Sequence, residues 1–244
     1  MFNLMKIVKY ALLIFFVCAL GVAYATQKDM IACKNSELLG FVHIGSNIYI
    51  DKNLLKSAHT KWFNLVANAR KRINDIYGPM TSNPVIVFTE TEKQSQKFGS
   101  NRYGRTIQGP FGQCVVIGSK GRNIDVVAHE LVHAEVHHRV GWFRHYTEIP
   151  IWFNEGVALQ VDNREPYLIV NIDIAPGEIE SIKLLDSIFF TSGNLVNNYK
   201  VAKLAVNGLE KKSFYENLDK IKSGSKFTNT FVSIGHLSSP QKEH

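Results

Sequence analysis

The 244-residue sequence predicts an α+β fold, with a sheet-bearing N-terminal lobe and a helical C-terminal lobe. Two observations support this prediction. Short apolar runs bounded by turn residues lie before residue 120, whereas apolar residues at helical spacing dominate after residue 150. We expect the lobes at about residues 35–141 and 142–244, within one domain that covers residues 26–244.

The expected strands all precede residue 120. Residues 41–44 and 47–51 surround a Gly-Ser turn, and residues 84–89 form a continuous apolar run that is typical of a buried strand. Residues 114–118 form a further strand. The glycine-rich residues 99–112 between these two runs are expected to be a connection.

The helices follow from apolar spacing and from their end signals. Residues 54–77 carry apolar residues at helical spacing and stop at Gly78-Pro79. A second helix is expected from residue 123 to Gly141, with Asp125 in its first turn, where a negative charge is favourable. Residues 142–150 are expected to be a loop. Further helices are expected at residues 150–161, 178–188, 192–207, 212–222 and 226–234.

The first 25 residues have the layout of a secretory signal peptide. Lys6 and Lys9 precede an uncharged apolar run that ends at Ala23-Tyr24-Ala25. This run is shorter than the roughly 20 residues of a membrane span, so a permanent anchor is the less favoured alternative. We therefore expect cleavage after Ala25 and a periplasmic or secreted mature chain, with no stable membrane anchor.

Composition limits the partners of the mature chain. Cleavage removes two lysines and no acidic residue, so the net charge falls from +7 to +5. That charge is spread along the chain without a basic and aromatic patch, which argues against a nucleic-acid partner. Cys33 and Cys114 remain after cleavage and are either a disulfide, as an oxidising compartment allows, or two separate buried thiols.

The central motif is the segment from His129 to His133, which reads HELVH. Two histidines four apart lie on one helical face, about 6 Å apart along the axis, so both can reach one metal ion. Glu130 follows the first histidine and can reach a water on the metal without ligating it, as a general base requires. Glu155 is the best third ligand, and the residues together predict a catalytic Zn²⁺ site with one open position.

The flanks of the motif favour a metal site over an amphipathic surface helix. The helix is apolar on most of its circumference, and a helix of this kind is buried. Two histidines and a glutamate inside it need partners, because unpaired buried polar groups cost several kcal/mol. His137 lies about 12 Å along the axis from His129, too far to share an ion. We expect His137 and His138 to form the polar end of the helix.

The two segments together resemble those of a known family. HELVH followed by the segment Pro150 to Ala158, which contains Trp-Phe-Asn-Glu-Gly, is similar to the gluzincins, specifically the peptidase-MA-like group. The resemblance covers about residues 84–231. It implies a zincin-like metalloprotease fold with zinc in the cleft between the lobes, held by His129, His133 and Glu155.

One departure from the family pattern bears on the substrate. The Gly-x-Met-Glu-Asn segment, with which aminopeptidase-type gluzincins hold a free N-terminus, has no counterpart here. The corresponding stretch, Gly109 to Gln113, contains no carboxylate. This difference favours an endopeptidase or another amide hydrolase over an aminopeptidase. The strand at residues 114–118 is the expected edge on which an extended peptide substrate would add.

The resemblance also implies an oxyanion donor. Residues 194–205 resemble the segment whose tyrosine supplies that donor, which points to Tyr199; the alternative is a core tyrosine on an amphipathic helix. Tyr215 and His145 are weaker candidates. Asn154 and Asp125 are candidates for orienting the ligands, although Asp125 is also explained as a charge at a helix start.

Four aromatic residues flank the expected cleft in sequence and are either a specificity pocket or part of the core: Trp142, Phe143, Tyr146 and Trp152. The sequence as a whole predicts an exported zinc metallopeptidase that acts on peptides or proteins. The alternatives are a catalytically silent binding or assembly module, which the intact Glu130 argues against, and an amide hydrolase of cell-wall peptides.

Overall fold

The computed structural model describes residues 27–232 apart from 57, 111, 182–185, 187–188 and 192, together with residues 9–10, 12 and 234. The expected cleavage site after Ala25 therefore lies outside the described residues. Within the part that is described, no helix is both long enough and apolar enough to cross a membrane. The chain folds into a mixed α/β structure with a five-stranded sheet, which agrees with the predicted α+β class.

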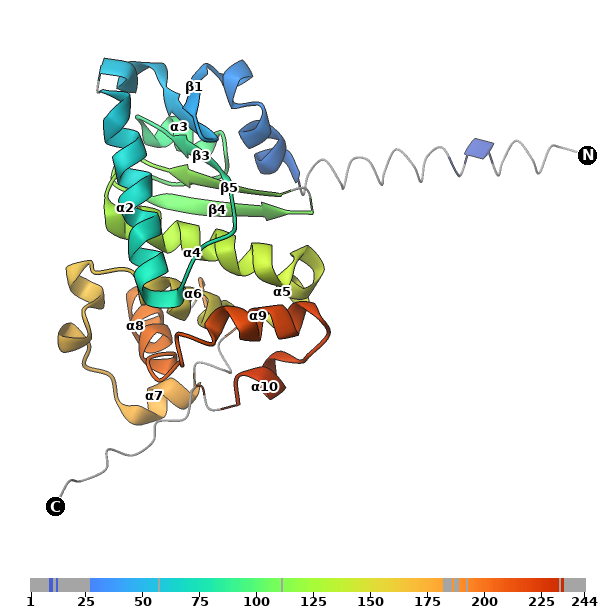
Figure 1. Cartoon of the computed structure of the whole chain (residues 1–244), viewed down its shortest axis with the longest axis vertical. Helices are drawn as coiled ribbons and strands as arrows, with labels where there is room; N and C mark the ends of the chain where they lie inside the picture. Colours follow the sequence, from blue (N-terminus) through green and yellow to red (C-terminus); the bar gives the residue numbers. More distant parts are fainter. Residues whose placement is uncertain are drawn as a thin grey trace, which may run out of the picture.

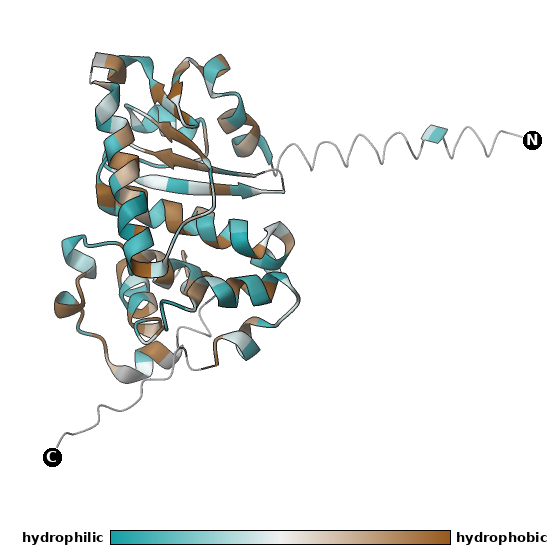
Figure 2. Ribbon diagram, viewed as in Figure 1, coloured by the Kyte–Doolittle hydropathy of each residue, from teal (hydrophilic) through white to brown (hydrophobic). Residues whose placement is uncertain are grey.

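The sheet has the strand order β1-β2-β3-β5-β4. Strands β2, β3 and β5 are parallel to one another, and β1 and β4 join the two edges antiparallel. Figure 2 shows the central strands as mainly hydrophobic and β4 as mixed in character. The strands are β1 (Phe41–Gly45), β2 (Ile48–Asp51), β3 (Val85–Phe88), β4 (Gly104–Gly109) and β5 (Gly112–Ile117).

Strand β4 corrects two expectations. Residues 104–109 form a strand and not a connection, and the strand at residues 114–118 is interior because β5 pairs with both β3 and β4. The strand was not recognisable from its sequence, since Ile107 is its one large apolar residue and glycines stand at both ends. Its partner β5 supplies the hydrogen bonds that hold it. The two edge strands of the sheet are therefore β1 and β4, and β4 is the one next to β5.

The expected helices are present, most of them shorter than predicted, and three helical segments were not expected: residues 27–34, 92–96 and 142–148. Residues 142–148 form helix α5, where a loop was expected, because Glu148 is held by Lys226 Nζ at 3.0 Å and Arg144 Nη1 at 3.5 Å. The α-helices are α2 (His59–Tyr77), α3 (Glu92–Gln96), α4 (Ile124–Val140), α5 (Trp142–Glu148), α6 (Ile151–Leu159), α7 (Pro176–Ser181), α8 (Leu195–Ala205), α9 (Phe214–Lys222) and α10 (Phe227–Thr230). Short 3-10 turns are η1 (Ser36–Leu39), η2 (Lys52–Lys56), η3 (Glu165–Tyr167) and η4 (Ile169–Asn171).

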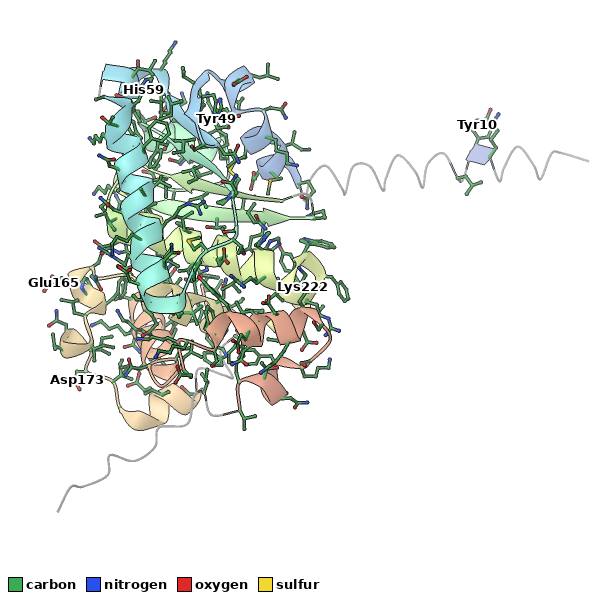
Figure 3. The ribbon with its side chains drawn as sticks, viewed as in Figure 1. Tyr10, Tyr49, His59, Glu165, Asp173 and Lys222 are labelled. Carbon is green, nitrogen blue, oxygen red and sulfur yellow. A yellow bond between two sulfur atoms is a disulfide. The ribbon has the colours of Figure 1, made fainter. Side chains whose placement is uncertain are left out.

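Helix α4 lies at the centre of the molecule. It packs against α2, β4 and β5 on one side and against α6 and α9 on the other (Figure 1). Side chains fill the layers on both sides of it (Figure 3). The helix begins where the Asn123 side chain accepts a hydrogen bond from the Val126 N–H at 3.0 Å, and it ends at Gly141, whose φ is 83°.

A second, smaller core lies on the sheet face away from α4. The helix over residues 27–34 covers this face, where Met30 packs with Ile107 and Val116. Cys33 and Cys114 are joined in a disulfide with a Cα–Cα distance of 6.3 Å, which settles the two alternatives for this pair. The bridge ties the N-terminal helix to β5.

Candidate metal centre

Three buried ligand atoms converge at the centre of the molecule. His129 Nε2 and His133 Nε2 are 3.2 Å apart, and Glu155 Oε2 lies 3.4 Å from each of them. In a tetrahedral zinc site with bonds of about 2.0–2.1 Å, ligand atoms are separated by roughly 3.3 Å. The nearly equilateral triangle therefore has the dimensions of one face of such a tetrahedron. The three residues form a group that could hold a metal ion.

The charges of these residues favour a bound cation. Burial alone would raise the pKa of the Glu155 carboxyl, but the charges of His133 and His129 lower it to about 2. Burial also lowers the pKa of His133, but Glu155 and Glu130 outweigh this and raise it to about 9. The directions of both shifts indicate that a positive charge is favourable beside the Glu155 carboxylate, and a metal ion would supply it. Apart from the two histidine nitrogens at 3.4 Å, Glu155 Oε2 has no hydrogen-bond partner among the described residues, which suits a metal-ligating oxygen.

Helices α4 and α6 carry the ligands, and a glycine on α6 allows that helix to pack closely on α8. The histidines lie on α4, and Glu155 lies on α6, which also contacts α8. Gly156 directly follows Glu155, and a Cβ atom at this position would overlap the Ala202 carbonyl of α8. The glycine of the Asn-Glu-Gly motif therefore permits the close packing of α6 on α8, the helix that carries Tyr199.

Glu130 is held against the edge strand. Thr106 Oγ1 on β4 lies 2.8 Å from both the Glu130 carbonyl oxygen and Glu130 Oε2, and donates its proton to one of them. A Cβ atom at Gly104 would lie 3.1 Å from Glu130 Cγ, so β4 passes close to this side chain. Glu130 is not one of the three converging ligands and lies beside them, with 8% of its surface exposed.

Asp162 lies beside His129 and was not predicted from the sequence. Its Oδ2 lies 3.6 Å from His129 Nδ1, the ring nitrogen that faces away from the ligand triangle. The side chain of Asp162 is fully buried, and Arg164 Nε donates to its two oxygens at 3.0 and 2.9 Å. Burial would raise the pKa of Asp162, but Arg164 and His129 lower it. No motif marks this residue, because it follows the end of α6 and reaches His129 only in the folded chain.

The two orienting residues that were expected have different roles. The carboxylate of Asp125 accepts hydrogen bonds from Arg72 Nη1 at 2.5 Å and from the Asn163 N–H at 3.1 Å, which joins the start of α4 to other segments. These contacts agree with the alternative that Asp125 is a charge at the helix start. Asn154 lines the cavity beside His133 and contributes to the raised pKa of that histidine.

Two cavities meet at the ligand group. One has a volume of about 460 Å³ and the other about 640 Å³, and both include His129, Glu130 and Tyr199 in their walls. Burial and the charge of Glu155 raise the pKa of the half-buried Tyr199, so its hydroxyl remains protonated and able to donate. The structure therefore brings Tyr199 to the site.

The two weaker candidates for the donor lie elsewhere. Tyr215 packs on α9 under the guanidinium of Arg139, with 3.8 Å from Arg139 Cζ to the ring centroid. His145 lies beside His137 at the end of α4, with ring centroids 5.2 Å apart. Neither side chain lines the two cavities.

The rim of the cleft is apolar on both sides of the ligand group. The exposed side chains of Tyr103 and Val196 line the smaller cavity. Those of Tyr146 and Phe190 line the larger one. Of the four aromatic residues expected near the cleft, Tyr146 lines it, whereas Trp152 belongs to the core with 3% exposure.

Comparison with family models, with curated proteins and with solved structures finds no match for this chain. The fold and the site define a mixed α/β protein whose central helix presents a buried His-His-Glu group that could hold a metal ion.

Proposed function

We propose that this chain is an exported zinc metallopeptidase of the gluzincin type, with a zincin-like fold, that cuts internal peptide bonds. The observation that carries the proposal is the convergence of His129, His133 and Glu155 beside Glu130, which is not a ligand. A structural metal site needs no such carboxylate, whereas hydrolysis does.

Zinc fits the donors better than magnesium or calcium does. Two imidazole nitrogens and one carboxylate oxygen are typical of catalytic zinc sites, and magnesium and calcium prefer oxygen ligands alone. Zinc bound there would polarise the substrate carbonyl and lower the pKa of a water.

The side chains around the metal group supply the remaining chemistry. Glu130 accepts the proton of the attacking water and returns it to the leaving amine, with Thr106 fixing one of its carboxylate oxygens. Tyr199 donates a hydrogen bond to the oxyanion from the cavity wall. Asp162 keeps the His129 ring in its orientation.

The cleft suits an extended peptide. β4 offers a free edge next to Glu130, so a substrate can add there as a further strand through main-chain hydrogen bonds. We therefore propose that the substrate adds to β4 and not to β5, which is an interior strand. The exposed apolar side chains at the rim could contact apolar side chains of a protein segment. The Cys33–Cys114 disulfide supports an oxidising, extracytoplasmic location.

The test combines metal content with turnover. We expect wild-type protein to retain one tightly bound zinc after dialysis and to cut an unbiased peptide library, with cleavage lost on chelation. His133→Ala should lose that zinc. Glu130→Gln should keep it and lose activity by about 10²–10⁴-fold, because the amide cannot accept the proton. His138→Ala, an exposed histidine of the same helix, is the matched control and should resemble wild type. Substantial activity in Glu130→Gln would exclude this mechanism.

A further inference from the structure

A second histidine pair lies at the far end of the central helix. His137 is on α4, one turn beyond His133, and His145 is on α5. Both side chains are more than nine-tenths buried, with 3% and 8% exposure. Neither belongs to the ligand group of the proposed catalytic site.

Most of the nitrogens of this pair have no partner. His137 Nε2 and both ring nitrogens of His145 are buried and form no hydrogen bond with the residues that the structure describes. Unpaired polar nitrogens in the interior destabilise the folded state, so a partner at these nitrogens would be favourable. The lone pair of a neutral imidazole nitrogen can accept a hydrogen bond or bind a metal ion.

The spacing of the rings suits a shared ion. Two imidazoles bound to one tetrahedral zinc-sized ion have ring centroids roughly 5.3 Å apart. The centroids of His137 and His145 are separated by 5.2 Å. The His129–His133 pair, whose Nε2 atoms converge, has a similar separation of 4.8 Å.

Gln113 can fix the tautomer that a metal needs. Gln113 Nε2 lies 2.9 Å from His137 Nδ1, where it donates a hydrogen bond, and turning the amide over puts its carbonyl oxygen in the same place. With the carbonyl oxygen on that side, Gln113 accepts the Nδ1 proton and leaves the lone pair of Nε2 free to ligate. Burial also lowers the pKa of His137 to about 4 and that of His145 to about 3, with neighbouring His138 and His133 adding to the shift, so both rings are neutral.

We propose that His137 and His145 form a second site, for a divalent first-row transition-metal ion such as Zn²⁺, Co²⁺, Ni²⁺ or Cu²⁺. Imidazole nitrogens without a carboxylate favour these ions over calcium and magnesium. With two protein ligands, this site binds less tightly than the group at His129. Its effect is to fasten α5, which carries Tyr146 of the cavity wall, to the end of α4.

The test is a metal titration that does not depend on activity. Chelator-stripped full-length protein is titrated with Co²⁺ while bound metal and the visible absorption of Co²⁺ are measured. We expect two equivalents in wild type, one tight and one weaker, and a single equivalent in His145→Gln. His138→Gln, the exposed neighbour of His137, should keep both.

A double variant separates this site from the proposed catalytic one. His129→Ala/His133→Ala should still take up one Co²⁺, whereas its combination with His145→Gln should take up none. If wild type binds a single equivalent, or if the double variant binds none while remaining folded by circular dichroism, the second site does not exist. If His145→Gln does not fold, the wild-type and double-variant titrations still decide.

Discussion

Asp162 acts on the metal group through a contact that only the folded chain creates. We expect Asp162→Asn to weaken zinc binding by about 10- to 100-fold, because the amide no longer holds His129 as a strong acceptor does. Competition with a zinc chelator measures this. Asp125→Asn is the matched control, since Asp125 is ion-paired at the start of the same helix and does not contact His129. Equal losses in both variants would contradict the orienting role.

Tyr199 gives a second prediction at the scale of a residue. Tyr199→Phe should lower kcat by about 10²–10³-fold without loss of zinc, because one oxyanion donor is removed. Tyr215→Phe removes a hydroxyl outside the cavities and should leave kcat and metal content unchanged. Steady-state kinetics on a cleaved library peptide distinguish the two. If both variants retain full kcat, Tyr199 is a packing residue.

The residues of the centre differ in how far sequence could predict them. His129, His133, Glu130 and Glu155 were predictable, because helical spacing and one short motif fix their types and positions. Thr106 was not, since it reaches Glu130 from a strand that the sequence did not reveal. Contacts of this kind depend on which segments meet in the folded chain, and the local spacing of residues does not predict that.

Helix α4 owes part of its position to a carboxylate that takes no part in chemistry. Glu135 is buried at 1% exposure and accepts hydrogen bonds from the Ser82 N–H at 2.7 Å and from Arg139 Nε at 2.6 Å. We expect Glu135→Ala to lower the free energy of unfolding by about 3–5 kcal/mol, because it breaks the buried ion pair with Arg139 and leaves the Ser82 N–H without its acceptor. Urea unfolding measures this. Lys71, in an exposed ion pair with Asp75, is the control site, and Lys71→Ala should cost less than about 1 kcal/mol.

The same carboxylate predicts a dependence of stability on pH. Burial would raise the pKa of Glu135, but hydrogen bonds from Ser82, Thr81 and Arg139 lower it from the usual 4.5. A carboxyl with a lower pKa in the folded state stabilises the fold fully above pH 4.5, and this contribution is lost as pH falls through the folded value. Unfolding free energies should therefore fall more steeply below pH 4.5 in wild type than in Glu135→Gln. Parallel curves for the two proteins would contradict this.

The elements show where local patterns fail. β4 has few apolar residues because one of its edges is free and one face lies on the buried polar centre. α5 has three aromatic residues and a β-branched threonine among seven, a weak helical composition, and its helix depends on tertiary ion pairs at Glu148. The long buried segments, α2 and α4, were predicted because burial imposes a spacing that the sequence records.

At the scale of the whole molecule, the cleft runs between the sheet edge and the C-terminal helices. It consists of the two cavities that meet at the ligand group. An aminopeptidase needs a carboxylate at one end to hold a terminal ammonium ion. β4 and β5 carry no acidic residue. Asp29 of the N-terminal helix lines the larger cavity, but its Oδ2 lies 3.3 Å from Arg105 Nη1, so its charge is already paired.

An ammonium ion in this cleft would therefore lose its water without gaining a partner, at a cost of several kcal/mol. Peptides cut at an internal bond would bind with the N-terminus outside the cleft, so we expect N-acetylation to change their kcat/KM by less than about tenfold, which corresponds to 1.4 kcal/mol. Mass spectrometry of paired free and acetylated peptides measures this. Arg105→Gln removes the ion-pair partner of Asp29. In that variant, kcat/KM of the free peptide should rise relative to that of the acetylated peptide. If wild type removes residues one at a time from free N-termini and spares acetylated peptides, a carboxylate already holds the terminus and the cleft is that of an aminopeptidase.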